Sequence, residues 1–377
     1  MAVRRRFRRR RRGVWTFVGL AAVLAGVLVL LALAVPAWFI GSYCFSVQSR
    51  PVERSAELTR AAADVKGYFR DESSTYLTLP EWYIVYNADE YAAFVKSRAP
   101  SRFPYFSAVG QYWRYYKQAC RATKRVYPFN AGNHLMLGVI GMSFSAENVV
   151  KGLYENTIGV LTENLGFYHT DEDVYARKTA QEYAEFIHAT PWYEFPFATK
   201  LKRLWTQTPL WGPDLVRKWE RRLVLTAEYS VKAVYGWIIG LGTRTAHQPE
   251  DLVIYAWLDE APDRIFEDTR IRKVKTLGLR SCIVALPRYT AFTPVVTALA
   301  RRGVRFHDLA GNDEILLTAI APRELDLQPP GGMVLSEEIL TNPATKRIGV
   351  RAPVRTLHVI LTDLPARGAS VEHLYDY

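Results

Sequence analysis

The sequence predicts a membrane-anchored α+β protein: an N-terminal transmembrane helix, a mainly helical, aromatic-rich central domain, and a small C-terminal α+β module with a mostly antiparallel sheet. Three observations support this fold class. An uncharged apolar stretch follows an arginine run, the long middle part carries helical signals, and short apolar runs separated by turn residues lie near the C-terminus. We therefore divide the chain into an arginine-rich cytoplasmic segment (1–12), a transmembrane helix (13–40), a helical membrane-proximal domain (41–245) and an α+β module (246–377).

The N-terminal part has the properties of a membrane anchor. Val14–Ile40 holds 27 almost purely apolar residues, and about 20 suffice to cross the hydrocarbon core as a helix. Eight arginines lie between Arg4 and Arg12, and such runs stay on the cytoplasmic side. We therefore expect a plasma (inner) membrane protein with the bulk of the chain on the non-cytoplasmic side. A cleaved signal peptide is the alternative, but its apolar core is about 7–15 residues long.

Composition narrows the function classes further. Of 377 residues, 49% are hydrophobic and 13% aromatic, which is typical of a folded chain with rings at membrane interfaces or in apolar grooves. The net charge of +12 comes mostly from the N-terminal arginines, so we expect no nucleic-acid partner. Three scattered cysteines, Cys44, Cys120 and Cys282, are too few for a disulfide scaffold or a cysteine zinc site.

Three long helices are expected in the central domain. Thr170–Ala189 begins with a capping threonine followed by three acidic residues. Residues 133–150 and 223–242 are apolar enough to leave two alternatives open, namely membrane spans or helices that lie in a core or in the membrane plane. If residues 133–150 spanned the membrane, the basic residues before them, such as Arg121 and Arg125, would lie on the non-cytoplasmic side. Basic flanks normally lie on the cytoplasmic side, so a topology with a single span is preferred.

Residues 191–222 alternate tryptophans with lysines and arginines. Such interleaving suits a segment in the headgroup region of a bilayer. Single-stranded nucleic acid is the rival partner, because bases stack on aromatic rings. With an anchor already in the chain, we expect the stretch Lys200–Arg222 to lie on lipid headgroups.

The pattern becomes mixed in the C-terminal part. Leu252–Leu258 and Ser281–Leu286 are short apolar runs that predict strands, and Thr293–Arg302 predicts a helix. Two further runs flank a Gly-Asn dipeptide at 311–312, which predicts a hairpin because both residues tolerate positive φ. Arg355–Thr362 is expected to be the last strand. Together these elements predict one helix packed on a mostly antiparallel sheet.

The sharpest chemical pattern is Glu185-Phe-Ile-His188 on the 170–189 helix. A Glu-x-x-His pair places a carboxylate and an imidazole on one helix face, and di-iron carboxylate bundles use two such pairs plus a glutamate from each of two other helices. The second pair is missing here, but Glu147, Glu155 and Glu228 lie on other expected helices. These five residues are therefore a candidate iron or manganese site. The alternative is that His188 caps the end of its helix, where a partly cationic ring is favoured.

We expect no cofactor apart from that metal candidate, and no catalytic residue is assigned. The preferred function is that of a bacterial-type integral inner-membrane protein with a non-catalytic binding or scaffolding role in the cell envelope. Its expected partners are the lipid bilayer and a lipid or protein ligand of the envelope. The alternative is a metal-dependent, di-iron-like membrane oxidoreductase that uses the Glu-x-x-His helix.

Overall fold

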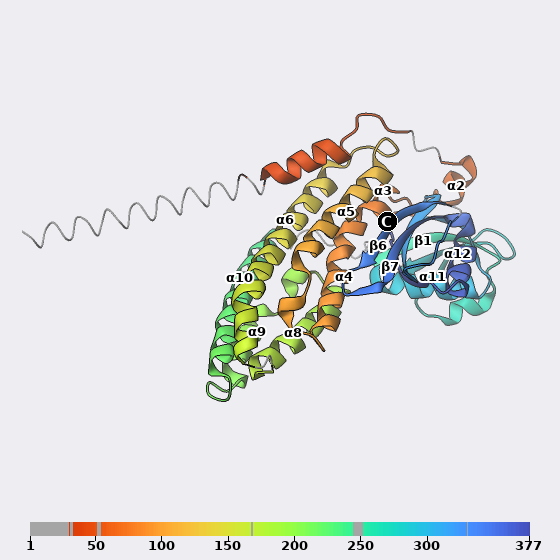
Figure 1. Ribbon diagram of the computed structural model, residues 1–377. Coiled ribbons are helices and arrows are strands. Elements are labelled where there is room, and N and C mark those ends of the chain that lie inside the picture. The colour runs from red at the N-terminus through yellow and green to blue at the C-terminus, as the bar shows by residue number, and fades with distance from the viewer. Residues whose placement is uncertain (1–29, 31–32, 51–53, 167–168, 244–251, 330) are drawn as a thin grey trace, which may run out of the picture.

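The computed structural model describes residues 30, 33–50, 54–166, 169–243, 252–329 and 331–377. Figure 1 shows a region of long helices beside a smaller module of strands and helices, with α4 and α5 between that module and the outer helices α6 and α10. The arginine-rich segment and most of the expected transmembrane helix lie outside the described residues. Among the helices that the structure describes, none combines the length and the apolarity needed to cross a bilayer.

The helical region contains α3 (Ser73–Leu77), α4 (Leu79–Phe94), α5 (Tyr105–Thr123), α6 (Ala131–Tyr154), α7 (Val160–Leu165), α8 (Asp171–Ile187), α9 (Phe197–Gln207) and α10 (Leu215–Thr243). The short helix α2 (Ala56–Ala61) lies instead beside the C-terminal module (Figure 1). A π-helical turn, Glu155–Gly159, joins α6 to α7. Residues 33–39 are also helical and continue into the π-helical turn Ile40–Cys44. The three expected helices are confirmed as α6, α8 and α10. Thr170 caps α8 as expected, because its side chain accepts a hydrogen bond from the Asp173 amide.

Tyrosines form the core of the helical region. Tyr112, Tyr115 and Tyr116 of α5 are fully buried. The rings of Tyr83 on α4 and Tyr115 have their centroids 4.7 Å apart, and the hydroxyl of Tyr112 donates to the Leu137 carbonyl on α6. Ring packing on α5 therefore holds α4 and α6 in place.

The C-terminal module contains the same βββαβ unit twice. The first unit is β1 (Val253–Asp259), β2 (Arg272–Thr276), β3 (Cys282–Pro287), α11 (Phe292–Arg301) and β4 (Arg305–Leu309). The second is β5 (Glu314–Pro322), β6 (Met333–Ile339), β7 (Asn342–Pro353), α12 (Leu357–Ala366) and β8 (Ser370–Leu374). Each unit forms a four-stranded antiparallel sheet, in the equivalent orders β2-β3-β1-β4 and β6-β7-β5-β8. One apolar core takes side chains from both sheets and from both helices.

The α+β class is confirmed, but three predictions for this module are wrong. Two helices and two four-stranded sheets take the place of the one helix and one sheet expected. The expected strand Arg355–Thr362 lies mostly in α12, where its apolar residues recur at helical spacing and Leu357, Ile360 and Leu361 are buried. The turn lies one residue earlier than expected, at Ala310 and Gly311 (φ 56° and 82°), and the Asn312 amide donates to the Leu309 carbonyl. Its flanking strands do not form a hairpin, however, because β4 pairs with β1 and β5 pairs with β7 and β8.

Polar contacts join the helical region to the second sheet of the module. Arg347 of β7 donates to Glu372 of β8 (2.7 Å) and to Glu90 of α4 (3.1 Å). The hydroxyls of Tyr86 on α4 and Tyr375 lie 2.7 Å apart. The sheet of the second unit therefore rests on α4, on the opposite side of the helical region from α10 (Figure 1).

Candidate functional site: an outward apolar face over a charged interior

The outward side of α6 and α7 is mostly apolar, although Asn156, Thr157 and Asn164 are also exposed. Its exposed apolar side chains recur at helical spacing and are Leu135, Met136, Val139, Val149, Val150, Leu153, Ile158, Leu161 and Leu165. In a helix on the surface of a protein in water, this side would carry polar residues. The amphipathicity of α6–α7 is therefore reversed.

The inward side of α6–α7 carries small and polar residues. The buried members of this side include Gly138, Gly141, Asn148, Gly152, Glu155, Gly159 and Thr162. A Cβ at position 141 would lie 2.3 Å from the Tyr112 ring, and one at position 138 would lie 2.9 Å from Pro36. The glycines therefore let neighbouring segments approach the α6 backbone closely, as small residues do between helices in membranes.

Helix α10 has the same reversed arrangement. Its exposed side chains are apolar: Leu215, Val216, Leu223, Val231, Val234, Trp237, Ile238 and Leu241. Its buried side begins with four cations, Arg217, Lys218, Arg221 and Arg222, of which the most exposed is only 3% accessible. Together, the exposed apolar residues of α6–α7 and α10 form a surface that we call the apolar face.

The four cations of α10 are neutralised by buried carboxylates. Arg217 contacts Asp173 at the start of α8 (2.9 Å), and Arg221 contacts Glu155 of the π-helical turn (2.7 Å). Glu172 of α8, which is fully buried, pairs with both Lys218 and Arg222. Because a charge in a protein interior is stable only when paired, this network fixes the relative positions of α7, α8 and α10.

A second ionic cluster joins α6 to α10. Lys151 lies 2.9 Å from Glu147 and 2.8 Å from Glu228, and Lys232 lies 2.8 Å from Glu147 and 3.2 Å from Glu228. Each charge therefore contacts two opposite charges. The same four residues interrupt the apolar sequence of both helices, and the structure places them in contact with one another across the two helices.

Three of the five metal-candidate residues belong to these ionic contacts. Glu147 and Glu228 are on neighbouring helices and share two lysines. Glu155 is buried and bonds to Arg221. The carboxylates are therefore occupied by ammonium and guanidinium groups of the chain itself.

The other two candidates, Glu185 and His188, lie elsewhere. Glu185 is exposed on α8. His188 is the C-cap residue of α8, and its Nε2 lies 2.9 Å from a carboxylate oxygen of Asp89 on α4. The hydrogen bond to Asp89 raises the pKa of His188 against the opposing effect of burial. This geometry is that of the helix-end alternative described above.

The structure corrects the expectation for the basic aromatic stretch. Lys200 is buried and pairs with Glu182, and the four cations of α10 point into the protein. Lys202 and Arg203 remain exposed on α9. Five of its seven cations are therefore buried and matched by acidic residues that are distant in sequence, whereas Trp205 and Trp211 are exposed.

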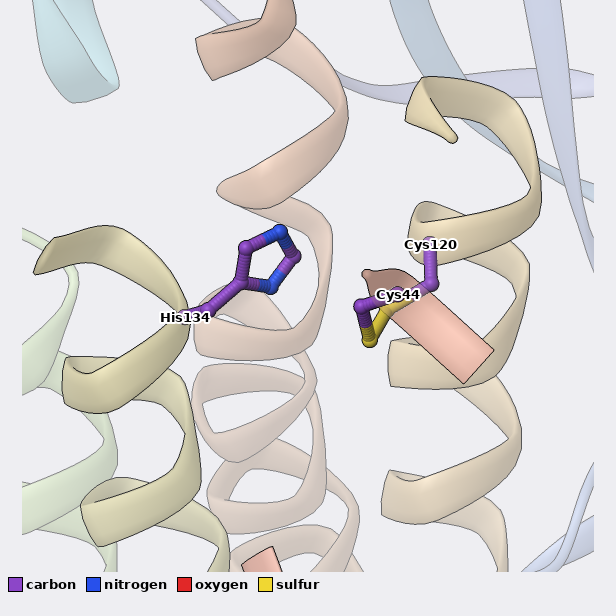
Figure 2. A group of neighbouring side chains, drawn as sticks. All are labelled: Cys44, Cys120 and His134. Carbon is purple, nitrogen blue, oxygen red and sulfur yellow. A yellow bond between two sulfur atoms is a disulfide. The ribbon is translucent and has the colours of Figure 1, made fainter. Parts of the chain in front are cut away.

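A separate group of side chains that could bind a metal lies where residues 33–44 meet the helical region. Cys44 and Cys120 of α5 form a disulfide, and their side chains face His134 in the first turn of α6 (Figure 2). The candidate ligand atoms of these three buried residues lie within 4.8 Å of one another. Burial lowers the pKa of His134 to about 4. The sequence provided no signal for this pairing, since the two cysteines are 76 residues apart.

Comparisons with known proteins do not extend this description. No protein-family model, curated protein or solved structure matches the chain. The functional argument therefore depends on the geometry of the chain itself.

Proposed function

We propose that this chain is a membrane-anchored protein with a non-catalytic binding or scaffolding role in the cell envelope, and that its helical region contacts lipid through the apolar face. The observation that carries the proposal is the reversed amphipathicity of α6–α7 and α10. Continuous apolar surfaces on monomers in water rarely exceed a few hundred Å². In hydrocarbon, by contrast, apolar side chains face outward, while small, polar and paired charged residues face inward.

The N-terminal part of the described chain supports the same assignment. Pro36 and Phe39 are buried, whereas Leu33, Val35 and Trp38 are exposed and apolar. Pro36 packs against Gly138 of α6, so the end of the expected anchor lies on the helix that carries much of the apolar face. The Cys44–Cys120 disulfide fits an oxidising, non-cytoplasmic compartment.

Spin labelling of the full chain in lipid nanodiscs tests this proposal. Val231→Cys and Leu153→Cys place a label on the apolar face, and Leu279→Cys places one on an exposed apolar residue of the module. The native cysteines give little background, since two are bonded to each other and Cys282 is buried. At positions 231 and 153 we expect lipid-soluble oxygen to relax the spin label more strongly than a water-soluble nickel chelate does. At position 279 we expect the nickel chelate to have the stronger effect. Relaxation mainly by the nickel chelate at both helical positions would refute the lipid contact.

The metal-dependent oxidoreductase stays an untested alternative. In the described residues, no observation favours it at Glu185 and His188, because His188 contacts Asp89 and Glu185 faces solvent.

A further inference from the structure

We infer that Cys44, Cys120 and His134 form a zinc site when the disulfide is reduced. The three residues come from three separate elements, namely the turn after residues 33–39, α5 and the start of α6. All three are buried and offer ligand atoms within 4.8 Å of one another. Figure 2 shows their side chains converging from these elements. The folded chain thus brings the donors together before any metal arrives.

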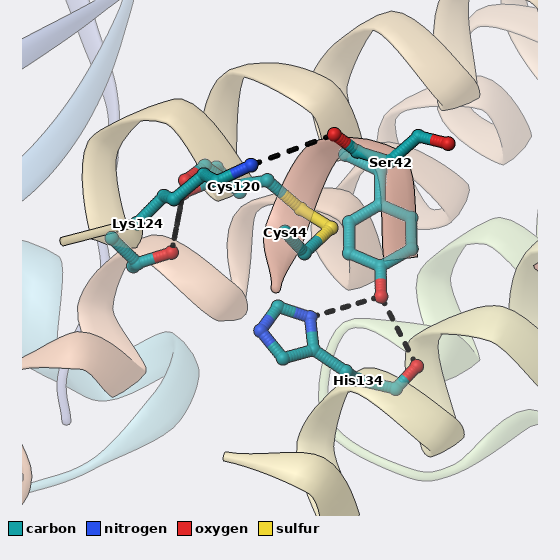
Figure 3. Close-up of a disulfide and its surroundings, with 8 residues drawn as sticks. Ser42, Cys44, Cys120, Lys124 and His134 are labelled. Carbon is teal, nitrogen blue, oxygen red and sulfur yellow. Dashed lines mark hydrogen bonds between the residues drawn. A yellow bond between two sulfur atoms is a disulfide. The ribbon is translucent and has the colours of Figure 1, made fainter. Parts of the chain in front are cut away.

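Hydrogen bonds to Tyr116 hold the ring of His134 in place. The hydroxyl of Tyr116 lies 3.0 Å from Nδ1 and donates to the His134 carbonyl at 3.1 Å (Figure 3). This contact fixes the ring of His134 beside the two sulfurs (Figure 3).

The donor set and the neighbouring space both fit zinc. Two thiolates and one imidazole, without a carboxylate, favour Zn²⁺ over Mg²⁺, Ca²⁺ or Mn²⁺. A cavity of about 10 Å³ is lined by Cys44, His134, Thr123 and Lys124, among others, and such a space holds about one water molecule. A water there would complete a tetrahedral site with three protein ligands.

The chemistry needs a reductant, for which we name a dithiol. The dithiol transfers two electrons and two protons to the S–S bond, so that Cys44 and Cys120 become thiols and the dithiol becomes a cyclic disulfide. Zn²⁺ then binds both sulfurs and a ring nitrogen of His134, and the two thiol protons are released to water. Oxidation reverses the sequence, re-forms the disulfide and releases the ion. Zinc occupancy is therefore coupled to the redox state of one cysteine pair.

Metal analysis of the full chain in detergent tests this inference. The protein is reduced with dithiothreitol without oxygen, freed of reductant, mixed with Zn²⁺, desalted and analysed by mass spectrometry. We expect about one zinc per reduced chain and background zinc in the untreated chain. Cys120→Ser and His134→Ala should each lower the affinity at least tenfold. Cys282→Ser, which changes a buried cysteine of β3, should keep full binding.

Circular dichroism separates loss of the site from loss of the fold. A reduced wild-type chain that keeps its helical signal but binds no zinc would overturn the inference, and so would equal binding by the His134→Ala chain. If reduction lowers the helical signal, the site predicts that zinc restores it. Failure of zinc to restore the signal would also count against the site. In a second probe, Co²⁺ should give the visible absorption of a tetrahedral thiolate complex in the reduced chain alone.

Discussion

The helical region and the C-terminal module bury opposite kinds of side chain. In the module, α11 buries Val295, Val296 and Leu299 and ends in arginines on the surface. In the helical region, α10 buries arginines and exposes valine, leucine and tryptophan. The module thus follows the arrangement expected in water, in which burial of apolar surface is the main stabilising term.

This difference is the one expected if the helical region contacts lipid, as we propose, while the module lies in water. Burying the cations of α10 is costly in any medium, and it is tolerated because Glu155, Glu172 and Asp173 neutralise them. Leaving the apolar face exposed is unfavourable in water and favourable in lipid. Six substitutions, four of them arranged as two matched pairs, measure how far this contrast holds.

The largest effect is expected from Arg222→Met in the charged interior. Arg222 is fully buried and bonds to Glu172 and to the Thr208 hydroxyl. The substitution therefore removes one of the cations that neutralise the buried carboxylate of Glu172. We expect the free energy of unfolding in detergent to fall by about 3–5 kcal/mol. The matched control is Arg280→Met in the module, whose pair with Glu260 is exposed, and about 0–1 kcal/mol is expected there. Equal losses in the two variants would contradict a structural role for the buried network.

A second pair of substitutions compares apolar residues of the two regions. Leu317 of β5 is fully buried, and Leu317→Ala should lower the free energy of unfolding by about 2–5 kcal/mol. Val231 of α10 is 67% exposed, and Val231→Ala should change it by less than about 0.5 kcal/mol. Chemical denaturation of both variants in the same detergent gives the comparison. A large loss for Val231→Ala would mean that this side of α10 packs against protein.

An intermediate, pH-dependent effect is expected at Asp308 of β4. Burial raises its pKa to about 6 from an ordinary value of 3.8, although Tyr68 and the Gly311 amide donate hydrogen bonds to it. The folded chain therefore holds this proton more tightly than the unfolded chain, and stability should fall as the pH rises from about 4 to 6. Asp308→Asn removes the titration and keeps an acceptor oxygen. Between pH 4 and pH 7, the free energy of unfolding of the variant should fall by about 1–3 kcal/mol less than that of the wild-type chain.

Urea denaturation of the wild-type and Asp308→Asn chains at several pH values measures this difference. The other titrating groups are common to both chains, so only the difference between the two profiles matters. Parallel profiles would show that Asp308 titrates alike in the folded and unfolded states.

The smallest effect is expected from His188→Gln. The pKa of His188 is raised by its hydrogen bond to Asp89, so its stabilising contribution is complete below the unfolded pKa and disappears as the pH rises through the folded pKa. The melting temperature should therefore drop slightly at pH 5.5 and hardly at all at pH 8.5. Because the pair is partly exposed, the effect should also weaken with salt. A wild-type melting temperature that drops when a chelator is added would instead support the metal hypothesis for this helix.

Helix positions were predictable from the sequence because their signals are local. Thr170 with the acidic residues after it predicted the start of α8 correctly, and apolar content predicted α6 and α10. The inward side of α10 was not predictable, since apolar residues on one side and cations on the other are equally compatible with either orientation. The choice depends on acidic partners in α8 and the π-helical turn, and those contacts are tertiary.

The missed parts of the module have a similar origin. An eight-residue apolar run such as 355–362 fits a strand or a buried helix, and its packing across β7 and β8 decides between them. The second βββαβ unit was not recognised because its strands β6 and β7 mix charged and apolar residues. The Cys44–Cys120 pair could not be found from spacing, because a disulfide requires proximity in the fold and not in the sequence.

The disulfide also has a mechanical consequence. A pulling force applied to the chain ahead of Cys44 passes through the sulfur–sulfur bond directly into α5, about one turn after the buried Tyr116. The residues between Cys44 and Cys120, including α2, α3 and α4, are thereby shielded from tension. A protein tethered at its N-terminal side would thus transmit load to α5. Cleavage of that single bond would shift the load first onto the contact of α2 and Tyr68 with the first sheet.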